Sequence, residues 1–154
     1  MAETKEPGDP LAVALFSELF MADQLARARL AKALPGDMEL SHFSVLNHLA
    51  RTNADRTPAQ LAKAFHVTRG AMTNTIGRLE WAGYVHVRPD WDDARRKIVS
   101  ISDAGRKARD EAFAAVAPIL DSVVAAAGTD NVRGALPVLR EIRRRFEDPN
   151  SSDE

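Results

Sequence analysis

The stretch that decides the fold is "HVTRGAMTNTIGRLEWAGYV", at positions 66–85. It predicts a helix that begins after a capping Thr68 and ends at Gly83. Three apolar residues share the i, i+4, i+7 spacing of one inward helix face: Met72, Ile76 and Leu79. The outward residues are small, polar or basic: Arg69, Gly70, Thr73, Asn74, Gly77 and Arg78. Each glycine lowers helix stability by about 1 kcal/mol relative to alanine, which indicates a steric requirement on this face.

A shorter helix precedes this one at the spacing of a helix-turn-helix. In "TPAQLAKAF", Thr57 is the expected N-cap, and Pro58 takes the first helical position, where its missing N–H costs nothing. The expected shared core consists of apolar residues from both helices and their turn: Leu61, Ala62, Val67, Met72, Ile76 and Leu79. Because an α-helix fits the major groove of B-DNA, the outward face of the second helix predicts contact with DNA. A merely solvated surface helix is the alternative.

The apolar spacing changes after the second helix. "YVHVR" and "KIVSI" alternate as strands do, and "PDWDDARR" between them predicts a hairpin with a charged loop. Arg95 and Arg96 cluster in this loop, and we expect Asp93 to hold the Arg95 side chain by a charge-assisted hydrogen bond. A basic loop beside a DNA-reading helix can lie along the minor groove, although an ordinary charged hairpin tip has the same sequence features.

Long helices are expected on both sides of this core. Residues 11–34 have apolar residues at helical spacing on more than one side, which is typical of a helix that buries its second side in a partner chain. We expect Ser41 to cap the next helix, and Ser102 to cap the helix that follows the hairpin. Pro118 is expected to kink or split that helix, and Pro137 to interrupt the last one.

The expected fold class is therefore mainly α with a small β-hairpin wing. A winged helix-turn-helix core is flanked by long N- and C-terminal dimerisation helices. The expected boundaries are a disordered arm over residues 1–10, a helical dimerisation region over 11–34 and 103–147, a DNA-binding region over 38–102 and a disordered tail over 148–154.

Composition and charge narrow the function classes. The chain of 154 residues has no cysteine, which excludes disulfides, thiol catalysis and thiolate metal sites. It shows no signal peptide and no apolar run long enough to span a bilayer, so we expect a cytoplasmic protein. The net charge is -1, yet residues 68–109 hold nine Lys or Arg against five Asp or Glu, leaving twelve against seventeen elsewhere. A basic patch on a neutral chain favours a polyanionic partner.

Several motifs together resemble the winged helix-turn-helix core of the MarR family of transcriptional regulators. These are the "TPAQLA" helix start, the pattern T-x-x-x-M-T-x-x-I-x-R-L-E-x-x-G-Y-V, the Asp-x-Arg of Asp93 and Arg95, and "VSISDAG". The resemblance covers about fifty residues closely. The chain departs from it at Ala94, where the family commonly has a second arginine, and at Trp91 near the wing tip.

The resemblance implies a homodimer, formed by the first and last helices, that binds pseudo-palindromic DNA. It also implies repression that a small anionic or aromatic effector relieves. By position, the residues expected in the major groove are Thr68, Arg69, Gly70, Thr73 and Asn74. Arg78 would meet a phosphate, Arg95 would enter the minor groove, and Arg96 would lie beside it.

An effector pocket and a metal site are weaker predictions. The pocket would involve His42 and four aromatic residues that could equally belong to the core: Phe16, Phe20, Phe43 and Phe113. The four histidines lack metal-ligand spacing, so no metal and no cofactor are expected. No phosphate loop, Gly-x-Ser-x-Gly, HExxH or carboxylate pair is present, and we expect no enzyme. The alternatives are a winged-helix protein-interaction module, a metal-responsive regulator and a DNA-binding protein without a ligand.

Overall fold

The computed structural model describes residues 8–148. The expected terminal arm and tail therefore lie largely outside the described residues, at positions 1–7 and 149–154. The chain divides into two compact units, one up to Ala115 and the other from Val116. Each unit is considered by itself.

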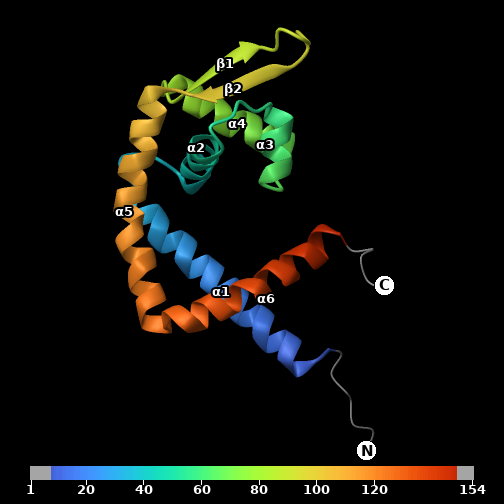
Figure 1. The fold of residues 1–154 in the computed structure, drawn as a ribbon, viewed down its shortest axis with the longest axis vertical. Helices are drawn as coiled ribbons and strands as arrows, with labels where there is room; N and C mark the ends of the chain where they lie inside the picture. Colours follow the sequence, from blue (N-terminus) through green and yellow to red (C-terminus); the bar gives the residue numbers. More distant parts are fainter. Residues whose placement is uncertain (1–7, 149–154) are drawn as a thin grey trace, which may run out of the picture. The chain divides into compact units, whose positions relative to one another are not determined.

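The order of elements confirms a mainly helical fold with one β-hairpin (Figure 1). The elements are α1 (Pro10–Ala33), α2 (Leu40–Thr52), α3 (Pro58–Ala64), α4 (Arg69–Trp81), β1 (Val85–Pro89), β2 (Lys97–Ile101), α5 (Asp103–Ala127) and α6 (Thr129–Glu147). Helices α3 and α4 form the helix-turn-helix, and the hairpin loop projects from the helical part of the first unit (Figure 1).

Three helix starts have the caps that the sequence predicts. The Thr68 hydroxyl accepts from the backbone N–H of Ala71 at 3.1 Å and so begins α4. At α3, the Thr57 hydroxyl accepts from the Gln60 N–H at 3.1 Å, and the Gln60 side chain accepts in return from the Thr57 N–H at 2.9 Å. This reciprocal pair satisfies two backbone donors that no helical bond reaches. Ser102 caps α5, because its hydroxyl accepts from the Gly105 N–H at 3.0 Å.

The predicted cap of α2 is wrong. The helix begins at Leu40, so that Glu39 is the N-cap residue and Ser41 lies inside the first turn. The backbone N–H of Glu39 donates to Nδ1 of His42 at 3.2 Å. The His42 ring thus satisfies the donor from three residues ahead, and a serine cap at position 41 is not needed.

The core lies between α2, α3, α4 and the hairpin. Its buried residues are Val45, Leu46, Leu49, Leu61, Ala62, Met72, Ile76, Leu79, Val85, Val99 and Ala108. Val67 was expected in this core, but its side chain is 43% exposed. It lies in the tight turn after α3, where its N–H donates to the Ala62 carbonyl at 3.1 Å. The turn backbone therefore holds Val67 in place, with its side chain partly in solvent.

The hairpin is anchored at its base to neighbouring segments. Its antiparallel register pairs Val85 with Ile101 and Pro89 with Lys97. The segment before α3 adds a bridge, in which the backbone groups of Arg56 and Val99 exchange hydrogen bonds at 3.0 and 2.7 Å.

The base of the hairpin also meets the start of α5 closely. The Ser102 hydroxyl donates to the Gly83 carbonyl at 2.6 Å, and the Ser102 N–H donates to the Tyr84 carbonyl at 3.0 Å. A Cβ at Gly105 would overlap the Tyr84 carbonyl oxygen, so this approach requires glycine.

Neither internal proline breaks its helix. α5 continues through Pro118 and α6 through Pro137, so the predicted split of these helices is absent. The loss of one N–H bond is tolerated in α5, where alanines, the best helix formers, dominate the turn before Pro118. Within residues 8–148, no single helix is long and apolar enough to cross a membrane; only α5 and α6 together, as a bent pair, pass by length and composition.

Candidate nucleic-acid interface

The outward face of α4 is exposed as the sequence predicts. Every residue of this segment that is expected to contact DNA is exposed: Thr68, Arg69, Gly70, Thr73, Asn74 and Arg78. A Cβ added at Gly70 or at Gly77 would meet no protein atom within 4 Å. No packing within the described chain therefore explains either glycine.

Arg78 has a partner that sequence spacing does not indicate. Its guanidinium lies 3.4 Å from the carboxylate of Glu39, the N-cap residue of α2. Both side chains are more than half exposed, so the pair is screened by water and is weak. The N-terminus of α2 thus stands beside the outward face of α4 and brings a carboxylate to it.

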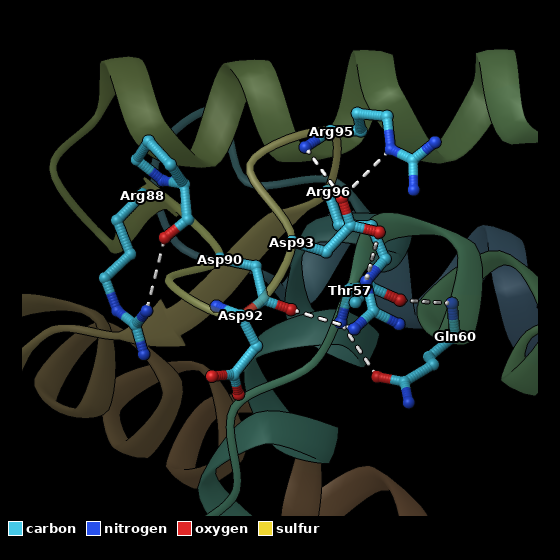
Figure 2. Close-up of polar contacts among 9 residues, drawn as sticks. Thr57, Gln60, Arg88, Asp90, Asp92, Asp93, Arg95 and Arg96 are labelled. Atoms are coloured by element: carbon cyan, nitrogen blue, oxygen red, sulfur yellow. Dashed lines mark hydrogen bonds and ion pairs between the residues drawn. The ribbon is translucent and has the colours of Figure 1, made fainter.

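The hairpin loop is held by its own charged side chains (Figure 2). The Asp90 N–H donates to the Arg96 carbonyl at 3.0 Å and closes the loop. The Asp90 carboxylate accepts from the Asp92 N–H at 3.0 Å and from the Arg96 guanidinium at 3.0 Å. Arg96 was predicted to contact DNA, but its guanidinium pairs with the Asp90 carboxylate inside the loop.

Asp93 holds Arg95, as the sequence predicts. Figure 2 shows the carboxylate accepting from both the backbone N–H and Nε of Arg95, each at 3.1 Å. These hydrogen bonds, first the one from the Arg95 side chain, keep the pKa of Asp93 below its ordinary value of 3.8, and the nearby charge of Arg96 acts in the same direction. The Asp93 carboxylate orients the Arg95 side chain, which remains 91% exposed, so that its outer nitrogens face solvent.

A second loop feature was missed by the sequence reasoning. Arg88 lies against the ring of Trp91, with its guanidinium carbon 4.6 Å from the ring centroid. The same guanidinium donates to the Asp55 carboxylate at 3.2 Å and to the Pro89 carbonyl at 3.4 Å. A tryptophan within a charged turn could have indicated the contact between Trp91 and Arg88. Nothing in the sequence indicates the ion pair between Arg88 and Asp55, which are 33 residues apart.

One of the predicted effector residues, His42, lies in the wall of a pocket. The first unit contains a pocket of about 940 Å³ between the segment from Pro35 to Glu39, the outward face of α4 and the start of α5. Its wall includes His42 but none of the four predicted phenylalanines. Phe16 and Phe20 contact each other on α1, with ring centroids 5.9 Å apart. Phe43 is half-buried, and Phe113 is exposed with the Arg109 guanidinium 5.1 Å from its ring centroid.

Among the described residues, no group of three or more His, Asp or Glu side chains is placed to hold an ion. His86 is exposed on β1, and His48 contacts the Phe65 ring edge-on at 5.4 Å between centroids.

Comparisons with known proteins agree with this geometry. Residues 36–96 match a family model described as MarR family. No curated protein sequence matches the chain. Among solved structures, a mutant MarR from E. coli complexed with operator DNA is 25% identical, with a TM-score of 0.76, and the match covers 88% of this chain and 99% of that chain. The match to the transcriptional regulator BldR from Sulfolobus solfataricus has 22% identity and a TM-score of 0.79, over 90% and 99% of the two chains.

A third structure concerns Bordetella bronchiseptica BpsR, whose DNA binding is regulated by 6-hydroxynicotinic acid. It is 20% identical, with a TM-score of 0.74, over 84% of this chain and 98% of that chain. The family model covers the helix-turn-helix and the hairpin loop, and the structural matches extend the likeness to the flanking helices. Residues 36–96 thus resemble the MarR family, and the described chain has the winged-helix fold of the MarR structures that it matches.

Proposed function

We propose that this protein is a homodimeric transcriptional regulator of the cytoplasm that binds a two-fold-symmetric duplex DNA site and represses transcription. The observation that carries the proposal is the outward face of α4. It is exposed, it holds a single acidic residue, Glu80, and it contains two glycines that nothing in the described chain requires. The two glycines lower the stability of the helix, and no packing within the described chain requires them. Their small size would allow this face to approach the major groove of DNA closely.

The predicted DNA-contacting residues of this face each have a role in the proposed complex. Thr68, Arg69, Thr73 and Asn74 lie on the first turns of α4, the part of a recognition helix that reaches base edges. Gly70 lets the helix backbone approach. On the next turns, Arg78 would exchange its weak, exposed pair with Glu39 for a DNA phosphate.

The wing supplies the second contact. Asp93 orients Arg95 before DNA arrives, which lowers the conformational entropy lost on binding. Arg95 would enter the minor groove, where the negative potential is strongest, and Arg96 would keep the loop in shape.

Exposed apolar side chains support a dimer. Helix α1 leaves large ones in solvent: Leu11, Val13, Phe20, Met21 and Leu25. The last helix does the same at Leu136, Val138 and Leu139. We propose that residues 11–34 and 103–147 form the dimerisation region and that residues 38–102 bind DNA. Two copies of α4 would then occupy successive major grooves about 34–36 Å apart.

A small effector is part of the proposal. The pocket beside α4 includes Thr73, Asn74 and Arg78, so a bound molecule would compete with DNA for the same side chains. Three carboxylates in its wall, from Asp37, Glu39 and Glu111, favour a neutral or cationic aromatic ring over an anion at this place.

The test is selection of duplexes from a random pool by the purified protein at moderate salt, followed by sequencing. An inverted repeat with half-sites one helical turn apart would support the proposal. If duplexes are retained without sequence preference, the protein is not a sequence-specific regulator. If no duplex is retained even at low salt, the alternative of a winged-helix protein-interaction module is favoured.

Arg95→Ala then tests the wing on the selected duplex. Loss of one phosphate-like contact lowers the slope of log K against log salt by about 0.9. The advantage of the wild type over the variant should therefore shrink about 3.5-fold between 50 and 200 mM salt. Equal affinity of the two proteins at low salt would remove the wing from the proposed interface.

A further inference from the structure

The tip of the wing carries an exposed indole that no role proposed above uses. Trp91 is 87% exposed, although tryptophan is the largest apolar side chain and is normally mostly buried. The Arg88 guanidinium lies against its ring, 4.6 Å from the centroid. Most of the ring surface is therefore presented to solvent from a loop.

The loop presents this ring in a fixed position. Arg88 is held by the Asp55 carboxylate and the Pro89 carbonyl, so it forms a stationary base beneath the ring. The Asp90–Arg96 backbone bond and the Asp90–Asp92 contact close the turn around Trp91. The indole can thus be placed on a partner with little further loss of conformational freedom.

Trp91 and Arg95 occupy matching places in the closed loop. The Asp90–Arg96 hydrogen bond joins its two arms, and Trp91 and Arg95 are the next residues inward on either arm. A surface that binds the loop tip can therefore contact the Arg95 guanidinium on one arm and the Trp91 indole on the other. Apolar side chains of minor-groove proteins pack against base steps of the duplex there, without needing a particular base.

On this geometry, and resting on the proposed DNA-binding function, we propose that Trp91 is a second DNA-contacting residue of the wing, packing its exposed ring against the deoxyribose and base edges of the minor groove beside Arg95. The contact is apolar, so it displaces no counterions. It contributes affinity that does not depend on salt, whereas Arg95 contributes affinity that does.

The affinity test compares variants on the duplex that the selection retains best. Trp91→Ala should weaken binding about tenfold with an unchanged salt slope, and Trp91→Phe should weaken it less. Arg95→Ala provides the contrast, since it lowers the slope. Because Trp91 is exposed, circular dichroism of the variants should match that of the wild type.

Fluorescence gives a second, independent measurement. The chain has two tryptophans, so Trp81→Phe leaves Trp91 as the only tryptophan, and excitation beyond the tyrosine absorption band isolates its emission. Its emission should be quenched when the duplex is added. The matched control is Trp91→Phe, which leaves the 91% exposed Trp81 at the end of α4, and its emission should change less.

Two outcomes overturn the proposal alone. One is wild-type affinity in Trp91→Ala with unchanged Trp91 emission; the other is a loss of salt slope equal to that of Arg95→Ala, which would mean that Trp91 acts only by positioning charges. If the wild type retains no duplex at all, the proposed function fails and this inference fails with it.

Discussion

Replacing the two outward glycines of α4 with alanine should change stability and DNA affinity in opposite directions. Gly70 and Gly77 have helical backbones, and a Cβ at either would meet no protein atom within 4 Å. Nothing in the described chain offsets the gain in helix propensity, about 0.8–1.0 kcal/mol for each substitution. For a chain of 154 residues, that gain raises Tm by about 2–4 °C for each glycine replaced.

DNA affinity should fall because the added methyl group would occupy the space through which the helix approaches the groove. Extra methyl groups in a well-packed contact cost about 1–3 kcal/mol. This cost corresponds to a rise in Kd of roughly five- to 150-fold. Gly70 lies in the first turn of α4, nearest the base edges, so Gly70→Ala should show the larger effect.

The measurements are thermal unfolding without DNA and titration of the selected duplex by fluorescence anisotropy. Gly134→Ala is the matched control, because Gly134 is a helical glycine on α6 with the same open space around its Cβ. It should raise Tm by a similar amount, and its Kd should be unchanged provided that sedimentation shows an intact dimer, since Gly134 lies in the proposed dimerisation region. If Gly70→Ala and Gly77→Ala stabilise the protein but bind DNA like the wild type, the steric reasoning for this face is refuted.

Four further results are expected. Glu39→Gln should tighten DNA binding about 1.4- to 5-fold, because breaking an exposed ion pair costs about 0.2–1 kcal/mol that the phosphate no longer has to overcome; unchanged or weaker binding in a titration would contradict this. NMR titration should place the pKa of Asp93 below 3.8, and the pKa should rise in Arg95→Ala. The ionised Asp93–Arg95 pair then stabilises the fold fully above pH 3.8, and this stabilisation is lost as the pH falls through the lowered pKa of the folded state. Gly105→Ala should lower the free energy of unfolding by about 1–3 kcal/mol in urea, since its Cβ would overlap the Tyr84 carbonyl, and a fully stable variant would show that this corner is not tight. Leu25→Glu, at a position 62% exposed on α1, should yield folded monomers in sedimentation, whereas an intact dimer would exclude this part of α1 from the interface.

Local signals in the sequence were sufficient for the recognition unit. The caps at Thr57, Thr68 and Ser102 form as predicted, because a cap joins residues two or three positions apart. The inward set on α4 follows helical periodicity, which is equally local. The hydrogen bond between Asp93 and Arg95 also spans only two residues, so the charged loop could be interpreted without a fold.

Tertiary structure decided the features that join distant segments. The approach of Glu39 to Arg78 spans 39 residues, and that of Asp55 to Arg88 spans 33; both follow from how α2 and its following segment pack on α4 and the hairpin. Val67 has an apolar side chain, yet the turn backbone leaves it partly in solvent. Sequence by itself determined the helix-turn-helix, the caps at Thr57, Thr68 and Ser102 and the chemistry of the outward face, because those depend on neighbours along the chain. Only the packed fold determined which charges oppose one another and where the indole of Trp91 stands, because these depend on segments brought together by the burial of the core.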